Sequence, residues 1–104
     1  MGNDCSAART AWDAAKSEVE RAERAAKATK APNGFMAFGA SDLMDAIYKS
    51  ARAVEDARQA GKDADNAALA FDLNGVRSAY RRAKVAADRA EAALRRVTNT
   101  KGTP

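Results

Sequence analysis

Apolar residues recur along this chain at alternating spacings of four and three, and the pattern occurs twice. The first run is Ala8, Trp12, Ala15, Val19, Ala22, Ala26 and Thr29. The second run is Val76, Tyr80, Ala83, Ala87, Ala90, Leu94 and Val97. This spacing is typical of helices that bury one stripe against other helices. Because alanine supplies half of the residues in the two runs, we expect the helices to approach one another closely.

A third helix is expected between these two runs, over residues 41–73. Its apolar positions begin at Leu43, Met44, Ile47, Ala51 and Val54, and then continue in a different phase at Ala57, Ala60, Ala64, Ala67 and Phe71. Gly61 lies near the change of phase. Glycine costs about 1 kcal/mol relative to alanine inside a helix, so we predict that this helix is kinked or split near Gly61. Asn74 and Gly75 are then interpreted as its C-terminal stop.

These elements predict an all-α fold, a small antiparallel three-helix bundle with Ala-rich heptad seams. The helices are expected over residues 6–30, 41–73 and 76–97 of a single domain, followed by a frayed tail over residues 98–104. Short connections make successive helices antiparallel. Trp12, Phe71 and Tyr80 should therefore meet in an aromatic cluster at one end. The middle helix is expected to be longer than its neighbours, and its overhang could contact a second copy in a homodimer.

Composition argues against several kinds of chemistry. The chain has no histidine, which removes the commonest general base near neutral pH and the commonest metal ligand. Cys5 is the only cysteine, so no internal disulfide is possible, and a free thiol is typical of a reducing compartment. No apolar run approaches the roughly 20 residues that cross a bilayer. We therefore expect a cytoplasmic protein that is not an enzyme, does not contact a membrane and has no metal site or cofactor.

The connector between the first two helices is unusually apolar. It contains Phe35, Met36 and Phe38, whereas connectors usually face water and are polar. These side chains could close the end of the bundle. Alternatively they form an exposed tip that docks a partner protein, because aromatic residues and methionine are enriched in interface cores.

Charge is unevenly distributed along the chain. Residues 32–75 carry seven acidic and four basic side chains, whereas residues 76–104 carry two acidic and eight basic ones. The candidate basic face is Arg77, Arg81, Arg82, Lys84, Arg89, Arg95 and Arg96. These residues could pair with the acidic middle helix, or they could contact the phosphates of a nucleic acid. Binding of the second kind would be non-specific and strongly dependent on salt.

The sequence favours stoichiometric binding of another protein as the function. A compact, Ala/Arg-rich chain without catalytic motifs suits a bacterial or phage gene, such as one encoding an inhibitor or adaptor of a host enzyme or defence complex. Non-specific nucleic-acid binding through the last helix is an alternative. A self-assembling structural protein is a further alternative.

Overall fold

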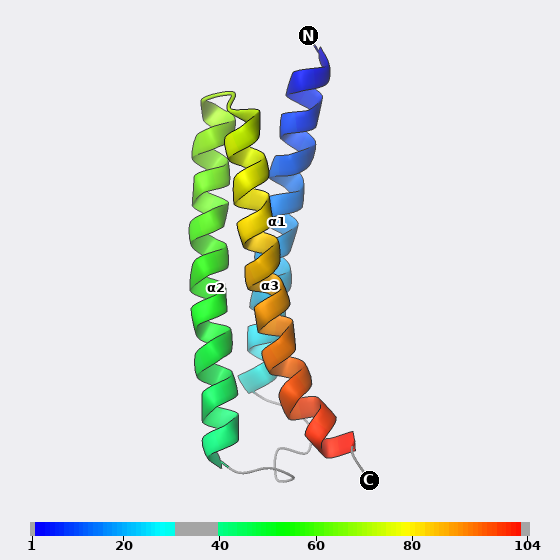
Figure 1. Ribbon diagram of the computed structural model, residues 1–104, viewed down its shortest axis with the longest axis vertical. Coiled ribbons are helices and arrows are strands. Elements are labelled where there is room, and N and C mark those ends of the chain that lie inside the picture. The colour runs from blue at the N-terminus through cyan, green and yellow to red at the C-terminus, as the bar shows by residue number, and fades with distance from the viewer. Residues whose placement is uncertain (1, 31–39, 103–104) are drawn as a thin grey trace.

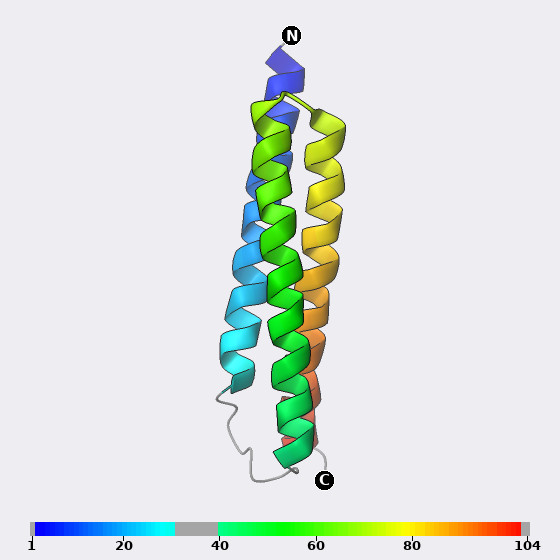
Figure 2. The same cartoon turned by 90° about the vertical axis from the view of Figure 1, so that its left-hand side faces the viewer.

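The computed structural model describes residues 2–30 and 40–102, and it consists of three helices packed against each other. Helix α1 spans Gly2–Lys30, α2 spans Ala40–Leu69 and α3 spans Leu73–Gly102. Helices α1 and α3 run in the same direction, and α2 runs antiparallel to both (Figures 1 and 2). The predicted all-α three-helix bundle is confirmed, and the described residues contain no strand.

The bundle is a narrow rod. Its Cα atoms extend over 56 × 21 × 15 Å with a radius of gyration of 16.2 Å, against about 13 Å for a globular chain of 100 residues. Helix α3 contacts both α1 and α2 more extensively than α1 and α2 contact each other. The side of the rod between α1 and α2 is therefore its most open side.

The interior consists almost entirely of alanine. Among the described residues, every buried apolar residue is an alanine except Val54, Val76 and Val97. Two buried polar side chains lie among them, and each donates a hydrogen bond to a carbonyl of its own helix: Thr29 to Ala25 and Ser50 to Ile47. These internal bonds let small polar side chains occupy the core without an unpaired donor.

The stripe that α2 buries differs from the predicted one. Its buried positions are Ala46, Ser50, Ala53, Val54, Ala57, Ala60, Gly61 and Ala64. The predicted Val54, Ala57, Ala60 and Ala64 are among them, whereas the first half of the stripe follows Ala46, Ser50 and Ala53. Met44 and Ala51 are exposed instead. The prediction followed the larger apolar side chains, whereas the helices are too close to one another to accept them, so the buried stripe uses the smallest residues and includes a serine.

Gly61 has a packing role, and α2 is neither split nor sharply bent there (Figures 1 and 2). A Cβ atom at Gly61 would lie 3.1 Å from Cγ2 of Val19 on α1. The glycine thus leaves room for a branched side chain of the neighbouring helix, which is why it is found inside a continuous helix.

Two further expectations about the helix bounds are wrong. Helices α2 and α3 have 30 residues each and α1 has 29, so α2 has no extra length to offer a second protomer. Helix α3 continues to Gly102, so residues 98–102 are helical and do not form a frayed tail, whereas residues 103–104 lie outside the described part.

Leucine substitutions at two alanines of α2 test the observed stripe. Ala53→Leu places a larger side chain at a fully buried contact and is expected to destabilise the bundle by about 1–3 kcal/mol. Ala51→Leu lies on the exposed side and should change stability by less than about 0.5 kcal/mol. Urea denaturation followed by circular dichroism measures both. A larger loss of stability in Ala51→Leu than in Ala53→Leu would instead support the stripe predicted from the sequence.

Candidate functional site

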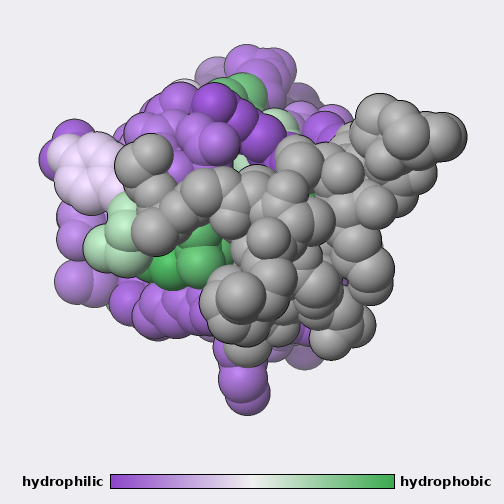
Figure 3. All heavy atoms as spheres, turned by 90° about the horizontal axis from the view of Figure 1, so that it is seen from below, coloured by the Kyte–Doolittle hydropathy of each residue, from purple (hydrophilic) through white to green (hydrophobic). Residues whose placement is uncertain are grey.

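The predicted docking tip, Phe35, Met36 and Phe38, lies outside the described residues. Figure 3 shows the end of the bundle opposite to the turn between α2 and α3. Among the described residues visible there, a hydrophobic area lies beside hydrophilic side chains. Leu43 and Leu94 pack there against buried Ala46, Ala93 and Val97.

The turn between α2 and α3 is very short and closely hydrogen-bonded. The Asp72 amide donates to the Ala67 carbonyl at 2.8 Å, and the Phe71 amide donates to the Ala68 carbonyl at 3.1 Å. These two bonds form a Schellman motif, whose C′ residue adopts a left-handed conformation and is usually glycine. Here that residue is Phe71, with a φ of 57°.

Asp72 then begins α3. Its carboxylate accepts a hydrogen bond from the Gly75 amide at 3.0 Å, and its carbonyl accepts one from Val76 at 3.0 Å, which is the pattern of a helix N-cap. A Cβ at Gly75 would lie 2.9 Å from Cβ of Ala67, so glycine permits the close approach of the two helices. Asn74 and Gly75 thus belong to the first turn of α3, and the predicted stop is wrong because Asp72 caps the helix before them.

The predicted aromatic cluster forms only in part. Trp12 and Tyr80 pack against a buried cluster of Ala15, Ala64 and Ala79. Phe71 does not join them, because its side chain is 83% exposed. Leu69, two residues earlier, is 80% exposed. Two large apolar side chains therefore face water beside the turn.

A groove of about 540 Å³ opens between α1 and the end of α2 beside these two residues. We call it the turn-end groove. It is lined by Ala8, Arg9, Trp12, Lys16, Asp65, Ala68, Leu69 and Phe71. The apolar pattern of the sequence predicts Trp12 and Phe71 at one end of the bundle. It does not predict a groove, because the same pattern predicts that Phe71 is buried.

The polar groups of the turn-end groove are arranged around Asp65. The Trp12 indole donates to Oδ1 of Asp65 at 2.6 Å, and the Lys16 ammonium lies 3.2 Å from the same atom. The Lys16 ammonium also lies 5.8 Å from the centre of the Trp12 ring. The hydrogen bond from Trp12, followed by Lys16, lowers the pKa of Asp65. Trp12 is thereby held in one orientation at the groove wall.

Most of the predicted basic face is occupied within the bundle. Arg82 and Arg89 of α3 each lie 2.7 Å from a carboxylate of α2, Asp63 and Asp56 respectively. Arg96 lies 3.2 Å from Asp45, which also contacts Lys49. For these three arginines the structure supports pairing with the acidic middle helix, the first of the two interpretations of the basic face.

The remaining basic residues have different surroundings. Lys84 lies 3.8 Å from Asp88 on its own helix, and the nearby charge of Arg95 helps to lower the pKa of Asp88. Three of the seven basic residues thus bridge α3 to α2, whereas Arg77 and Arg81 make no ion pair with any described residue and their charges remain available to phosphate.

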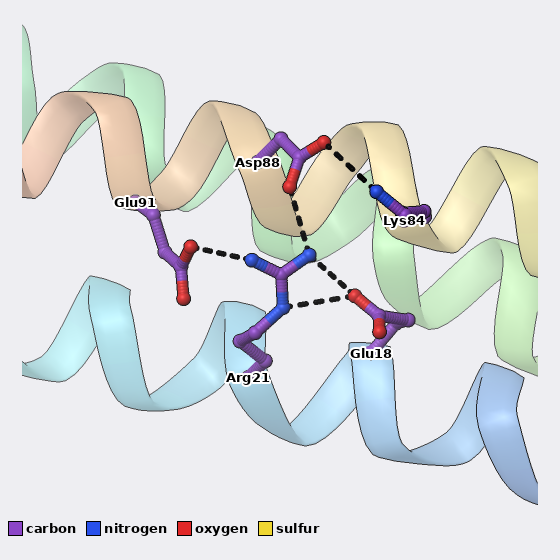
Figure 4. Close-up of polar contacts among 5 residues, drawn as sticks. All are labelled: Glu18, Arg21, Lys84, Asp88 and Glu91. Carbon is purple, nitrogen blue, oxygen red and sulfur yellow. Dashed lines mark hydrogen bonds and ion pairs between the residues drawn. The ribbon is translucent and has the colours of Figure 1, made fainter.

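Arg21 of α1 is the most highly connected charge in the structure. Figure 4 shows its guanidinium pointing from α1 towards α3, between Glu18, Asp88 and Glu91. The guanidinium of Arg21 donates a hydrogen bond to Oδ1 of Asp88 at 2.8 Å, and this bond is the main cause of the raised pKa of Arg21. The same bond lowers the pKa of Asp88. This cluster ties α1 to α3.

The described residues contain no group of three or more histidine, cysteine or acidic side chains that could hold a metal ion. None of the three helices, as far as they are described, combines the length and apolarity of a membrane span. Comparisons with known protein families, with curated proteins and with solved structures find no significant match.

Two substitutions of Phe71 distinguish the cost of its left-handed backbone from any contribution of its ring to stability. Phe71→Gly relieves the left-handed conformation and is expected to stabilise the bundle by up to about 1 kcal/mol. Phe71→Ala removes the ring but keeps the strain, so it should stay within about 0.5 kcal/mol of the wild type. Thermal denaturation provides the measurement. A large loss of stability in Phe71→Ala would mean that the ring is part of the core.

Acid should destabilise the bundle only below about pH 4, the usual pKa range of free carboxyl groups. The pKa values of Asp63, Asp65 and Asp88 are lowered in the folded state. The unfolded chain therefore takes up protons first as pH falls, and stability is lost as pH passes through the folded pKa values. Because the chain has no histidine, urea denaturation should give a constant free energy of unfolding from about pH 7 to 5. A decline within that interval would contradict this assignment.

Proposed function

We propose that this chain is a non-enzymatic protein that binds another protein stoichiometrically, and that the turn-end groove is its contact site. The observation that carries this proposal is Phe71. Its ring is 83% exposed and its backbone is left-handed with a φ of 57°. A bulky residue in this conformation costs about 1–2 kcal/mol, and an exposed ring gains nothing from burial. Glycine or asparagine would form the same turn without these costs, so the ring serves a contact outside the chain.

The surroundings of Phe71 support the same function. Leu69 is exposed beside it, Trp12 and Ala68 provide an apolar wall, and the groove between them is open. Aromatic anchors in such apolar depressions carry much of the energy of protein interfaces. The described residues offer no comparable set of catalytic groups, so the protein would act by occupying a surface of its partner. A cytoplasmic inhibitor or adaptor, encoded by a bacterium or a phage, is the kind of protein that acts in this way.

Non-specific binding of nucleic acid is the second candidate, and the structure favours it less. Arg82, Arg89 and Arg96 already contact carboxylates of α2. Each phosphate contact would therefore compete with a bond inside the bundle. Self-assembly is a third candidate, which draws no support from the length of α2, since the three helices are nearly equal in length.

The proposal is tested by affinity capture from a cell extract of bacteria that express the protein, followed by quantitative mass spectrometry. Phe71→Gly should reduce recovery of the partner about 30-fold, because loss of an aromatic anchor costs about 2 kcal/mol or more. Met44→Ala and Tyr48→Ala serve as matched controls, since each removes a 62% exposed apolar side chain far from the turn.

Salt and nuclease treatment distinguish the two candidates. A partner held in the turn-end groove should remain bound at high salt and after nuclease digestion. Recovery that is unchanged by Phe71→Gly would contradict the proposed contact. Recovery that disappears with nuclease or at high salt would favour nucleic acid instead.

A further inference from the structure

We propose that the turn-end groove receives one amphipathic α-helix of the partner, with its apolar face on Trp12, Leu69 and Phe71 and an acidic side chain directed at Arg9. This inference names the kind of partner and rests on the proposed function. Three features of the groove carry it: its walls, its length and its uncommitted charge.

The walls of the groove are two antiparallel helices on the most open side of the bundle. Helices α1 and α2 contact each other less than either contacts α3. A fourth helix lying between them would complete a four-helix arrangement, in which each helix packs its apolar stripe against two neighbours. An extended peptide would find no unpaired strand edge here, because the described residues contain no strand.

The length of the groove matches about two turns of helix. From Ala8 to Lys16 along α1 the rise is about 12 Å at 1.5 Å per residue. The side chains of a bound helix at positions i, i+3 or i+4 and i+7 span about 10 Å on one face. Three apolar anchors on such a helix can therefore reach the Trp12, Leu69 and Phe71 side chains at the same time.

The uncommitted charge of the groove is positive. Both oxygens of Asp65 lie within hydrogen-bonding distance of Lys16, and one also accepts the Trp12 indole, so this carboxylate is already satisfied. Arg9 is exposed and makes no ion pair with any described residue. The side chain of Lys16 is 44% exposed, and its ion pair is with Asp65. An acidic side chain on the incoming helix is the complement of these groups.

The experiment selects helix-forming 16-residue peptides from a display library on the wild-type protein, with counter-selection on Phe71→Gly. We expect enriched peptides to carry large apolar residues at i, i+3 or i+4 and i+7, with Asp or Glu beside them. Trp12 is the only tryptophan of the chain and lines the groove. Its fluorescence in titrations with tryptophan-free selected peptides therefore gives their affinities directly.

A charge exchange then tests the orientation. Arg9→Glu should weaken the selected acidic peptides about tenfold, and the same peptides with Lys in place of the acid should recover that loss. Arg24→Glu is the matched control, because Arg24 is an exposed arginine of α1 outside the residues that line the groove, and it should change affinity less than about twofold.

Several results would overturn the inference. One is the enrichment of peptides that are rich in proline or in basic residues. Another is that the selected peptides bind the Phe71→Gly variant as tightly as the wild type. A third is that no peptide is enriched at all. A concentration-dependent dimer that Phe71→Gly abolishes, measured by light scattering, would identify a second copy as the occupant and also overturn it. If partner capture still depends on Phe71 in these cases, the proposed function stands and only the helical, acidic partner is rejected.

Discussion

The small size of alanine at nearly every buried contact is the constraint on which this bundle depends. A side chain of one carbon lets three helices lie close together along a rod 56 Å long and 15 Å thick. Close approach also decides which other residues are tolerated inside. Ser50 and Thr29 fit because they are small and bond to their own helices, and Gly61 makes room for Val19. Larger apolar side chains such as Met44, Leu69 and Phe71 remain exposed.

Periodicity in the sequence was sufficient for the helices and for the stripes of α1 and α3, because each stripe there has one consistent spacing. The stripe of α2 was predicted correctly at Val54, Ala57, Ala60 and Ala64. It was misplaced in the first half of the helix, where Ile47 and Ala51 compete with Ala46, Ser50 and Ala53 for the same pattern. Hydrophobicity favours the first set, whereas the distance between helices favours the second. That distance is a property of all three helices together, so a pattern read along one segment could not supply it.

The candidate site was largely beyond prediction for a related reason. A turn with phenylalanine in the left-handed position is unusual, so Asn74 and Gly75 offered a more ordinary stop. The capping ability of Asp72 was the available signal, since aspartate readily begins a helix. The pairing of basic residues with the acidic middle helix was easier to predict from the sequence. Arg82 and Arg89 are seven residues apart on α3, as are Asp56 and Asp63 on α2. The ion pairs Arg82–Asp63 and Arg89–Asp56 both form.

Because nearly every buried residue is alanine, the core alone does not fix how far along the rod α1 lies relative to α2 and α3. The ion pairs of α1 fix this register. If α1 slid by one heptad, alanines would again face alanines. In the observed register Lys16 pairs with Asp65 and Glu23 pairs with Arg58. Sliding α1 in one direction would place Lys16 against Arg58, two positive charges. Sliding it in the other direction would place Glu23 against Asp65, two negative charges. Arg21, level with Asp88, would meet Arg81 or Arg95. Surface charges that contribute little to stability individually thus select a single register for a helix whose buried face cannot distinguish one heptad from the next.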